Sequence, residues 1–256
     1  MSSAAVRSAR VSPGLVASAL AALLGVALVP AAAAFDRDGP RDRTVARSGL
    51  IATSVRGRPI TLIERGDRDS PVKELVIGCI HGNEPAGIAI AERLESLPLA
   101  GEAELLLVED ANPDGVASGT RTNGNGVDLN RNFPWHWRRS GVQGDPHYSG
   151  PRPFSEPESR ALARLIREER PTVTIWFHQP WATVDESGGN VSVERRYAQL
   201  VGLPLRRLPR VAGGATDWQN TRFPATTSFV VELPAGSLSR LSAVRYARAA
   251  LRLVAP

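Results

Sequence analysis

The segment Glu74–Ile80 constrains the fold of this chain more than any other part of the sequence. After Glu74 it reads Leu-Val-Ile-Gly-Cys-Ile, a nearly continuous apolar run with no polar residue alternating along it. Strands of this kind are buried on both faces, as they are in parallel sheets that helices cover on each side. We therefore expect a central strand here and an α/β architecture around it.

The rest of the chain alternates strand and helix patterns. Two β-rich runs, 50–55 and 60–63, flank Arg-Gly-Arg-Pro and predict a hairpin. Further strands are predicted at 105–108, 172–177 and 228–233, and helices at 85–97, 155–169 and 239–253, the second beginning with a Ser155–Glu158 capping box. Without internal repeats, this order predicts the α/β class: a single-domain α/β/α sandwich with a central mixed, largely parallel sheet.

The N-terminus has the features of an export signal. Arg7 and Arg10 precede an uncharged, Ala/Leu/Val-rich run over 14–34 that ends in four alanines. A charged region, an apolar region and a small-residue cleavage site in this order are typical of a signal peptide. An uncleaved membrane anchor is the alternative reading, since the run approaches the roughly 20 residues that span a bilayer.

We therefore predict a signal peptide over 1–34, a flexible leader over 35–47 and a catalytic domain over 48–256. The mature protein is expected to be secreted by a bacterium, outside the cell or associated with its wall, with no stable membrane insertion after cleavage.

Cysteine content and charge exclude several classes of protein. Cys79 is the only cysteine, which rules out an intramolecular disulfide and every zinc site with two or more cysteine ligands. Any metal must therefore be held by histidine and carboxylate. The 31 basic and 26 acidic residues give a formal charge of +5, far from the balance of a nucleic-acid-binding protein.

Candidate metal ligands follow two of the predicted strands. His81-Gly82-Asn83-Glu84 comes directly after the apolar strand, and His178 comes directly after the strand at 172–177. Ligands bind at the carboxyl ends of the strands in open α/β sheets. Two histidines and one glutamate leave an open position for water, as in catalytic zinc sites. Either histidine alone fits a hydrogen-bonded structural role better than a ligand role.

The region 111–153 is rich in Gly, Asn, Pro and Asp and has little periodicity. A loop of this length in a compact domain is functional or disordered, and the motifs within it favour function. His136 and His147, which lie among aromatic residues there, could line a substrate cleft or pack the loop down, and we expect packing.

Three motifs in addition to the histidines carry a resemblance to a known family. They are Asp128-Leu129-Asn130-Arg131-Asn132-Phe133, Asn112-Pro113-Asp114-Gly115 and Val231-Glu232-Leu233. In this order and spacing the set resembles the carboxypeptidase A-like zinc carboxypeptidases over about residues 48–254.

The resemblance implies one Zn2+ per chain and a role for each matching residue. His81, Glu84 and His178 match the zinc ligands, and Glu232 matches the general base that takes a proton from zinc-bound water. Arg121 matches the arginine that polarises the scissile carbonyl, and Asn130 with Arg131 matches the pair that binds the terminal carboxylate of the substrate. These roles agree with general chemistry, since a metal lowers the pKa of water and arginine binds carboxylates bidentately.

Within the family, 128–134 and 150–158 are most similar to the bacterial murein peptide amidase branch. That branch implies hydrolysis of the bond between γ-D-glutamate and meso-diaminopimelate in cell-wall peptides. One position departs from the pattern of the family: Asn220 follows Asp217-Trp218 where carboxypeptidases commonly have a tyrosine. Asn220 is expected to contact substrate by a hydrogen bond.

Three other functions stay open. A general metallocarboxypeptidase would carry the same site. An aspartoacylase or succinylglutamate desuccinylase-like deacylase shares a His-Gly-Asn-Glu start, but the export signal and the early end of the chain after Glu232 weigh against it. An inert module that binds cell-wall peptides would have lost a ligand or the base, and all four residues are present.

Overall fold

The computed structural model describes residues 46–99 and 103–254. The predicted signal peptide, 1–34, and nearly all of the predicted leader lie outside the described residues. Arg47, the last residue of that leader, already belongs to the first strand. None of the helices within 46–99 and 103–254 has the length and apolar character to cross a membrane.

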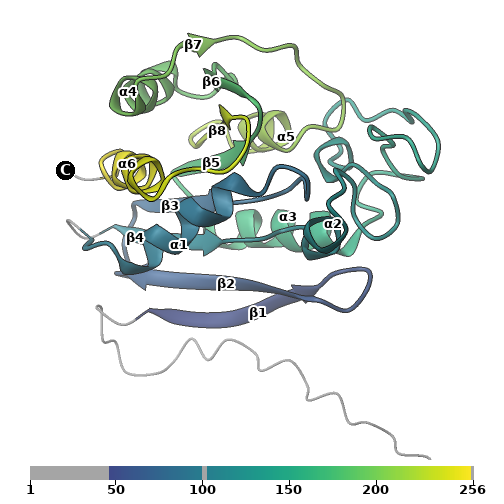
Figure 1. Cartoon of the computed structure of the whole chain (residues 1–256), viewed down its shortest axis with the longest axis horizontal. Helices are drawn as coiled ribbons and strands as arrows, with labels where there is room; N and C mark the ends of the chain where they lie inside the picture. The colour runs from purple at the N-terminus through teal and green to yellow at the C-terminus, as the bar shows by residue number, and fades with distance from the viewer. Residues whose placement is uncertain (1–45, 100–102, 255–256) are drawn as a thin grey trace, which may run out of the picture. The chain divides into compact units, whose positions relative to one another are not determined.

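The centre of the fold is one mixed sheet of eight strands in the order β1-β2-β4-β3-β5-β8-β6-β7 (Figure 1). The pairs β4-β3, β3-β5, β5-β8 and β6-β7 are parallel, and the other three are antiparallel. The strands are β1 (Arg47–Thr53), β2 (Pro59–Gly66), β3 (Lys73–Ile77), β4 (Glu104–Val108), β5 (Val173–His178), β6 (Trp181–Asp185), β7 (Leu205–Arg206) and β8 (Thr227–Pro234). The predicted central strand is thus β3, flanked by parallel neighbours.

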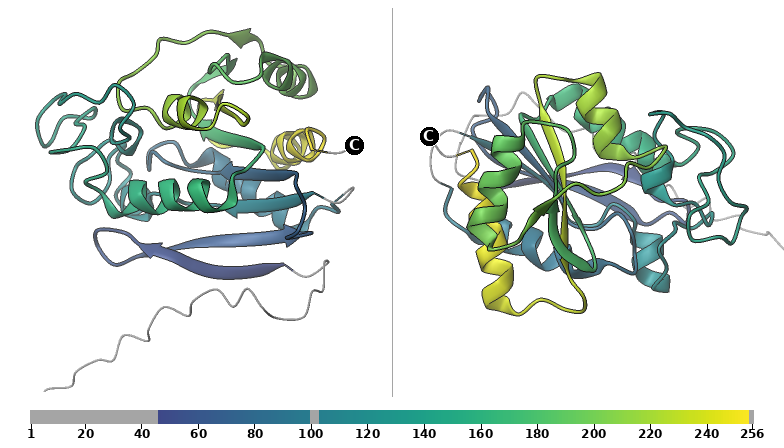
Figure 2. Two further views of the ribbon diagram at one scale, coloured as in Figure 1. Left: turned by 180° about the vertical axis from the view of Figure 1, so that it is seen from behind. Right: turned by 90° about the horizontal axis from the view of Figure 1, so that it is seen from above.

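Helices pack on both faces of this sheet, as the predicted α/β/α sandwich requires (Figure 2). One hydrophobic cluster joins the sheet to α1, α4 and α6, and the other joins it to α3 and α5. The helices are η1 (Pro85–Gly87), α1 (Ile88–Ser96), α2 (Pro113–Ser118), η2 (Leu129–Arg131), α3 (Pro157–Glu169), α4 (Val191–Val201), α5 (Ala215–Arg222) and α6 (Arg240–Leu251).

Two local predictions differ from the structure. β3 ends at Ile77 instead of Ile80, and Gly78–Ile80 continue outside the strand. The capping box of α3 is wrong: the N-cap is Glu156 without a side-chain cap, and the Ser155 hydroxyl donates to Glu156 Oε1 at 2.6 Å. Glu158 instead accepts from the Val55 amide at 3.0 Å, because β1 and its turn lie against this helix.

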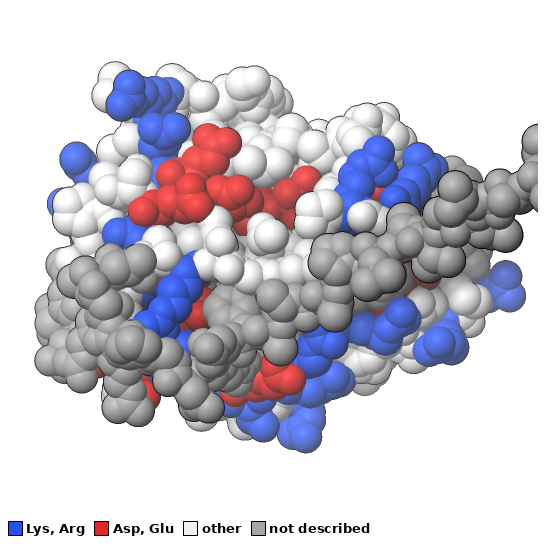
Figure 3. Space-filling model, turned by 90° about the horizontal axis from the view of Figure 1, so that it is seen from below, with Lys and Arg blue, Asp and Glu red and all other residues white. Residues whose placement is uncertain are grey.

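Charged side chains of both signs share the surface seen from below in Figure 3, where acidic groups lie between basic ones. On that face, the described basic residues do not form one continuous patch.

Glu194 gives this fold a testable pH dependence. Its carboxylate lies fully buried in α4, and burial, followed by the nearby Asp185, raises its pKa to about 7. A raised carboxyl pKa favours the folded state while the group is protonated, so this contribution is lost as the pH rises from about 4.5 to 7. We expect Glu194→Gln to remove the loss and to stabilise the protein by about 1–3 kcal/mol at pH 8. Urea unfolding of both proteins at pH 5 and pH 8 checks this, and an equal stability difference at the two pH values would contradict it.

Candidate metal centre and cleft

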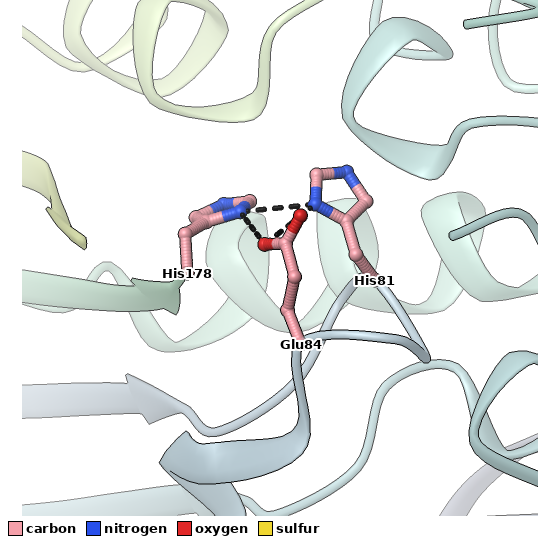
Figure 4. A group of neighbouring side chains, drawn as sticks. All are labelled: His81, Glu84 and His178. Carbon is pink, nitrogen blue, oxygen red and sulfur yellow. Dashed lines mark hydrogen bonds and ion pairs between the residues drawn. The ribbon is translucent and has the colours of Figure 1, made fainter. Parts of the chain in front are cut away.

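Three side chains, two from the turn after β3 and one from the end of β5, converge at the carboxyl edge of the sheet (Figure 4). His81 lies in the turn after β3, Glu84 directly precedes η1, and His178 ends β5. His81 Nδ1 lies 3.1 Å from Glu84 Oε2 and 3.0 Å from His178 Nδ1, and His178 Nδ1 lies 3.0 Å from Glu84 Oε2. All three residues are buried.

The local backbone explains how His81 and Glu84 meet. Gly82 lies against the backbone of Gly115, so closely that a Cβ would overlap it. The Glu84 amide donates to the His81 carbonyl at 2.9 Å, closing the turn. These contacts bring two side chains three residues apart to one point, as the sequence predicted.

The donor set fits a zinc ion. Two ligands at zinc–nitrogen bond lengths of about 2.0–2.1 Å stand about 3.3 Å apart in a tetrahedral site. The donor atoms of His81, Glu84 and His178 can all lie within 4.8 Å of one another, and the nitrogen and oxygen atoms that face each other are at 3.0–3.1 Å. Burial lowers the pKa of His178, which favours the neutral imidazole that coordinates metals.

Asp128 orients the first of these histidines. It is fully buried, and its Oδ1 lies 3.0 Å from His81 Nε2. Burial alone would raise the pKa of Asp128, but His81 and Arg121 hold it well below its usual range. The carboxylate in turn raises the pKa of His81 against the effect of burial. A carboxylate on the outer nitrogen leaves Nδ1 as the ligand atom and makes it more basic.

We expect Asp128→Asn to weaken zinc binding by about 10- to 100-fold, because outer-shell partners of histidine ligands contribute about that much to metal affinity. Competition with a fluorescent zinc chelator measures the affinity directly. Asp145→Asn, an exposed aspartate in the same region, is the matched control. An unchanged affinity in Asp128→Asn would show that Asp128 does not support the metal site.

Glu232 lies beside the cluster because β8 runs parallel to β5, with Glu232 the Cα partner of His178. It is buried, and its Oε2 has no hydrogen-bond partner among the described residues. Burial, and then the negative charge of Glu84, raise the pKa of Glu232 to about 7. A carboxylate with a pKa near neutrality and a free oxygen can accept a proton.

Arg121, Asn130 and Arg131 all line the cleft of about 400 Å³ that opens at the cluster. Arg121 donates to Glu84 Oε1 at 2.7 Å and to Asp128 Oδ2 at 2.9 Å. Asn130 Oδ1 accepts from the Ala215 amide at 2.9 Å, which leaves its Nδ2 donors for another partner. Arg131 lies mostly buried beside them, and burial lowers its pKa.

Asn220 does not join these residues. It lies on α5 outside that cleft, and its amide donates to the carbonyls of Ser187 and Ser228 and accepts from the Ser228 amide. Its hydrogen bonds hold α5 to β8, and we therefore withdraw the expected substrate contact for Asn220.

Three residues that line the cleft, His147, Gln179 and Arg210, were not assigned to this site from the sequence. His147 lines the cleft instead of packing the loop down, and its Nδ1 lies 3.4 Å from Asp128 Oδ2. The backbone amide of Gln179 donates to Glu84 Oε2 at 3.1 Å. The side-chain amide of Gln179 donates to the carbonyls of Pro234 and Gly236, each at 2.8 Å. Arg210 lines the cleft and pairs with Asp217. The position of Gln179 directly after His178 could have pointed to it, and the aromatic residues around His147 left a cleft role open for that histidine. Nothing in the sequence places Arg210 near the cluster.

Comparisons with known proteins agree with this geometry. The family model "Zinc carboxypeptidase" matches residues 41–180. Murein peptide amidase A of Escherichia coli strain K12 is 34% identical over 145 residues, which are 51% of this chain and 58% of the relative. The matching protein of Vibrio campbellii is 36% identical over 148 residues, 52% and 58% of the two chains. The alignments thus span somewhat more than half the length of these curated relatives.

Among solved structures, murein-tripeptide amidase MpaA from Escherichia coli O157 superposes with a TM-score of 0.65 at 26% identity, covering 84% of this chain and 96% of that one. The predicted fold class is confirmed by this likeness. Because the family model matches more than half of the sequence and includes His81, Glu84 and His178, the chain belongs to the zinc carboxypeptidase family.

Proposed function

We propose that this protein is a zinc-dependent amidase that hydrolyses the γ-D-glutamyl–meso-diaminopimelate bond of cell-wall peptides with a free terminal carboxylate. The observation that carries the proposal is the cluster of His81, Glu84 and His178 with Glu232 as the strand partner of His178. The similarity to murein peptide amidases over half of the chain supports the choice of bond.

His81 Nδ1, Glu84 and His178 Nδ1 would hold the zinc ion, which supplies a Lewis acid that lowers the pKa of water and polarises a carbonyl. Glu232 accepts a proton from the attacking water at its free Oε2, and the same carboxyl group then donates that proton to the leaving amine. Because Glu232 belongs to β8 and is the strand partner of His178, the sheet holds its backbone next to the cluster.

Arginine and asparagine side chains position the substrate. Arg121 is held by Glu84 and Asp128, so its remaining N–H groups can stabilise the oxyanion that forms as water attacks. Arg131 and the Nδ2 donors of Asn130 bind the terminal carboxylate of the substrate. The cleft thus presents fixed cations where negative charge lies or develops.

The direct test is digestion of L-alanyl-γ-D-glutamyl-meso-diaminopimelate by the purified protein, with products identified by mass. We expect release of free meso-diaminopimelate, its loss after treatment with a zinc chelator, and its return when zinc is added back. A folded, zinc-loaded protein that leaves this peptide intact would contradict the proposal. Release of C-terminal residues from ordinary peptides would then favour a general carboxypeptidase, and cleavage of N-acyl amino acids would favour a deacylase.

We also propose that the protein acts outside the cytoplasm, where such peptides occur. The charged, apolar and small-residue regions of the segment 1–34 support export. The intact mass of the protein recovered from the cell envelope or medium tests this, with cleavage after Ala34 expected. An intact N-terminus in the membrane fraction would support an anchor instead.

A further inference from the structure

An ion pair between Arg210 and Asp217 forms part of the wall of the cleft. The Asp217 carboxylate is buried in the first turn of α5, whereas the Arg210 side chain, from the segment between β7 and α5, is 42% exposed. The proposed mechanism uses neither residue. Because Arg210 is partly exposed in the cleft, a bound ligand can reach its guanidinium group.

The pair lines the same cleft as Asn130 and Arg131, which we propose to bind the terminal carboxylate. The segment that joins Arg210 to Asp217 is held against η2 and the residues that follow it by two hydrogen bonds: the Ala215 amide donates to the Asn130 side-chain Oδ1, and the Phe133 amide donates to the Gly213 carbonyl at 3.0 Å. A residue whose α-carboxylate sits on Asn130 and Arg131 therefore has its side chain near Arg210 and Asp217. This residue is the one released by hydrolysis.

The arginine also contacts the segment after β6. Its guanidinium packs on Gly188, in the place that a Cβ would occupy, and Gly188 has a φ of +86°. The acidic residues just before this glycine have partners of their own: Asp185 accepts from Ser187 and from the Leu208 amide, and Glu186 pairs with Arg207. Arg210 and Asp217 thus place one positive and one negative group together in the lining of the cleft.

We propose that Arg210 and Asp217 recognise a zwitterionic side chain on the released residue, with its carboxylate on Arg210 and its ammonium on Asp217. This inference rests on the proposed function and specifies how that site selects its substrate. When such a side chain binds, Arg210 pairs with the carboxylate of the ligand in place of Asp217, and Asp217 pairs with the ammonium group of the ligand in place of Arg210. The net charge of the site stays the same. A side chain with an ammonium alone leaves Arg210 without a new partner, and a site built for charged hydrogen bonds discriminates against ligands that cannot make them.

Three peptides of the form L-alanyl-γ-D-glutamyl-X test the proposal on the zinc-loaded protein. In these, X is meso-diaminopimelate, meso-diaminopimelate amidated at its distal carboxylate, or L-lysine. We expect kcat/KM to be at least about tenfold higher for the first than for the other two, because a charged hydrogen bond contributes about that much. The difference should appear mainly in KM, since the pair does not touch the reacting atoms.

Two variants assign the effect to the pair. Arg210→Gln should bring the three substrates to similar kcat/KM values by lowering only the first. Asp217→Asn should lower kcat/KM for all three, since each carries the ammonium group. Arg207→Gln, a mostly exposed arginine of the same segment, is the matched control and should leave the ratios unchanged.

The outcomes separate this inference from the proposed function. Equal kcat/KM values for the three peptides, or an unchanged preference in Arg210→Gln, would overturn the inference while the proposed function stands. If none of the peptides is cleaved, the proposed function is wrong, and calorimetric binding of free meso-diaminopimelate and L-lysine decides the inference separately. Tighter binding of meso-diaminopimelate that is lost in Arg210→Gln would support it, and equal affinities would overturn it.

Discussion

Glu232→Gln is expected to bind zinc normally and to lower kcat by about 10²- to 10⁴-fold, the range that general acid–base groups contribute. The amide keeps the shape of the carboxyl group in β8 but cannot accept a proton at the atom that is unpartnered in the structure. Zinc content by atomic absorption and kcat on the diaminopimelate tripeptide measure the two effects separately.

Glu194→Gln is a well-matched control for this variant. Glu194 is also a buried glutamate whose pKa is raised to about 7, but it lies on α4 and does not line the cleft. Its substitution should leave kcat unchanged. Full activity in Glu232→Gln would remove Glu232 from the mechanism, and an equal loss in both variants would point to a general effect of changing buried carboxylates.

The second large effect is expected from His178→Ala, which removes one of the three proposed metal ligands. Loss of a residue that only hydrogen-bonds a metal ligand lowers metal affinity by at most about 100-fold. We expect the loss of zinc affinity in His178→Ala to be larger than this, and hydrolysis to fall to background. Zinc titration of the metal-free protein gives the affinity, and circular dichroism shows whether the fold persists.

His136→Asn is the control for this substitution. His136 is an exposed histidine with a φ of +42°, a conformation that asparagine tolerates better than alanine does. It should bind zinc and turn over as the unsubstituted protein does. Normal zinc affinity in His178→Ala would show that the metal is held elsewhere.

The sequence was sufficient to predict the parts of this site that depend on strand ends. The apolar run that became β3 and the strand that became β5 are parallel neighbours, so His81 and His178 necessarily emerge at one edge of the sheet. Glu84 followed from its spacing to His81. These inferences needed only local pattern and the general topology of α/β sheets.

Contacts between distant segments were beyond such reasoning. The capping box at Ser155 failed because Val55, about a hundred residues earlier, offers Glu158 a backbone donor. The segment from β6 to α5 was not divided into elements, since β7 has two residues and its pairing depends on β6. For the same reason Arg210 was missed. Asn220 was assigned to substrate from its place after Asp217-Trp218, but its partners are backbone groups of Ser187 and Ser228.

The pairing of His178 with Glu232 has a consequence for how such an enzyme can diversify. Both residues belong to one hydrogen-bonded ladder, so the sheet fixes the backbone spacing between the proposed metal ligand and the proposed proton acceptor. Arg210, in contrast, comes from the connection between β7 and α5, outside the regular elements. Exchanging that connection for one of different sequence should therefore change which side chain is accepted and leave the hydrolytic chemistry in place.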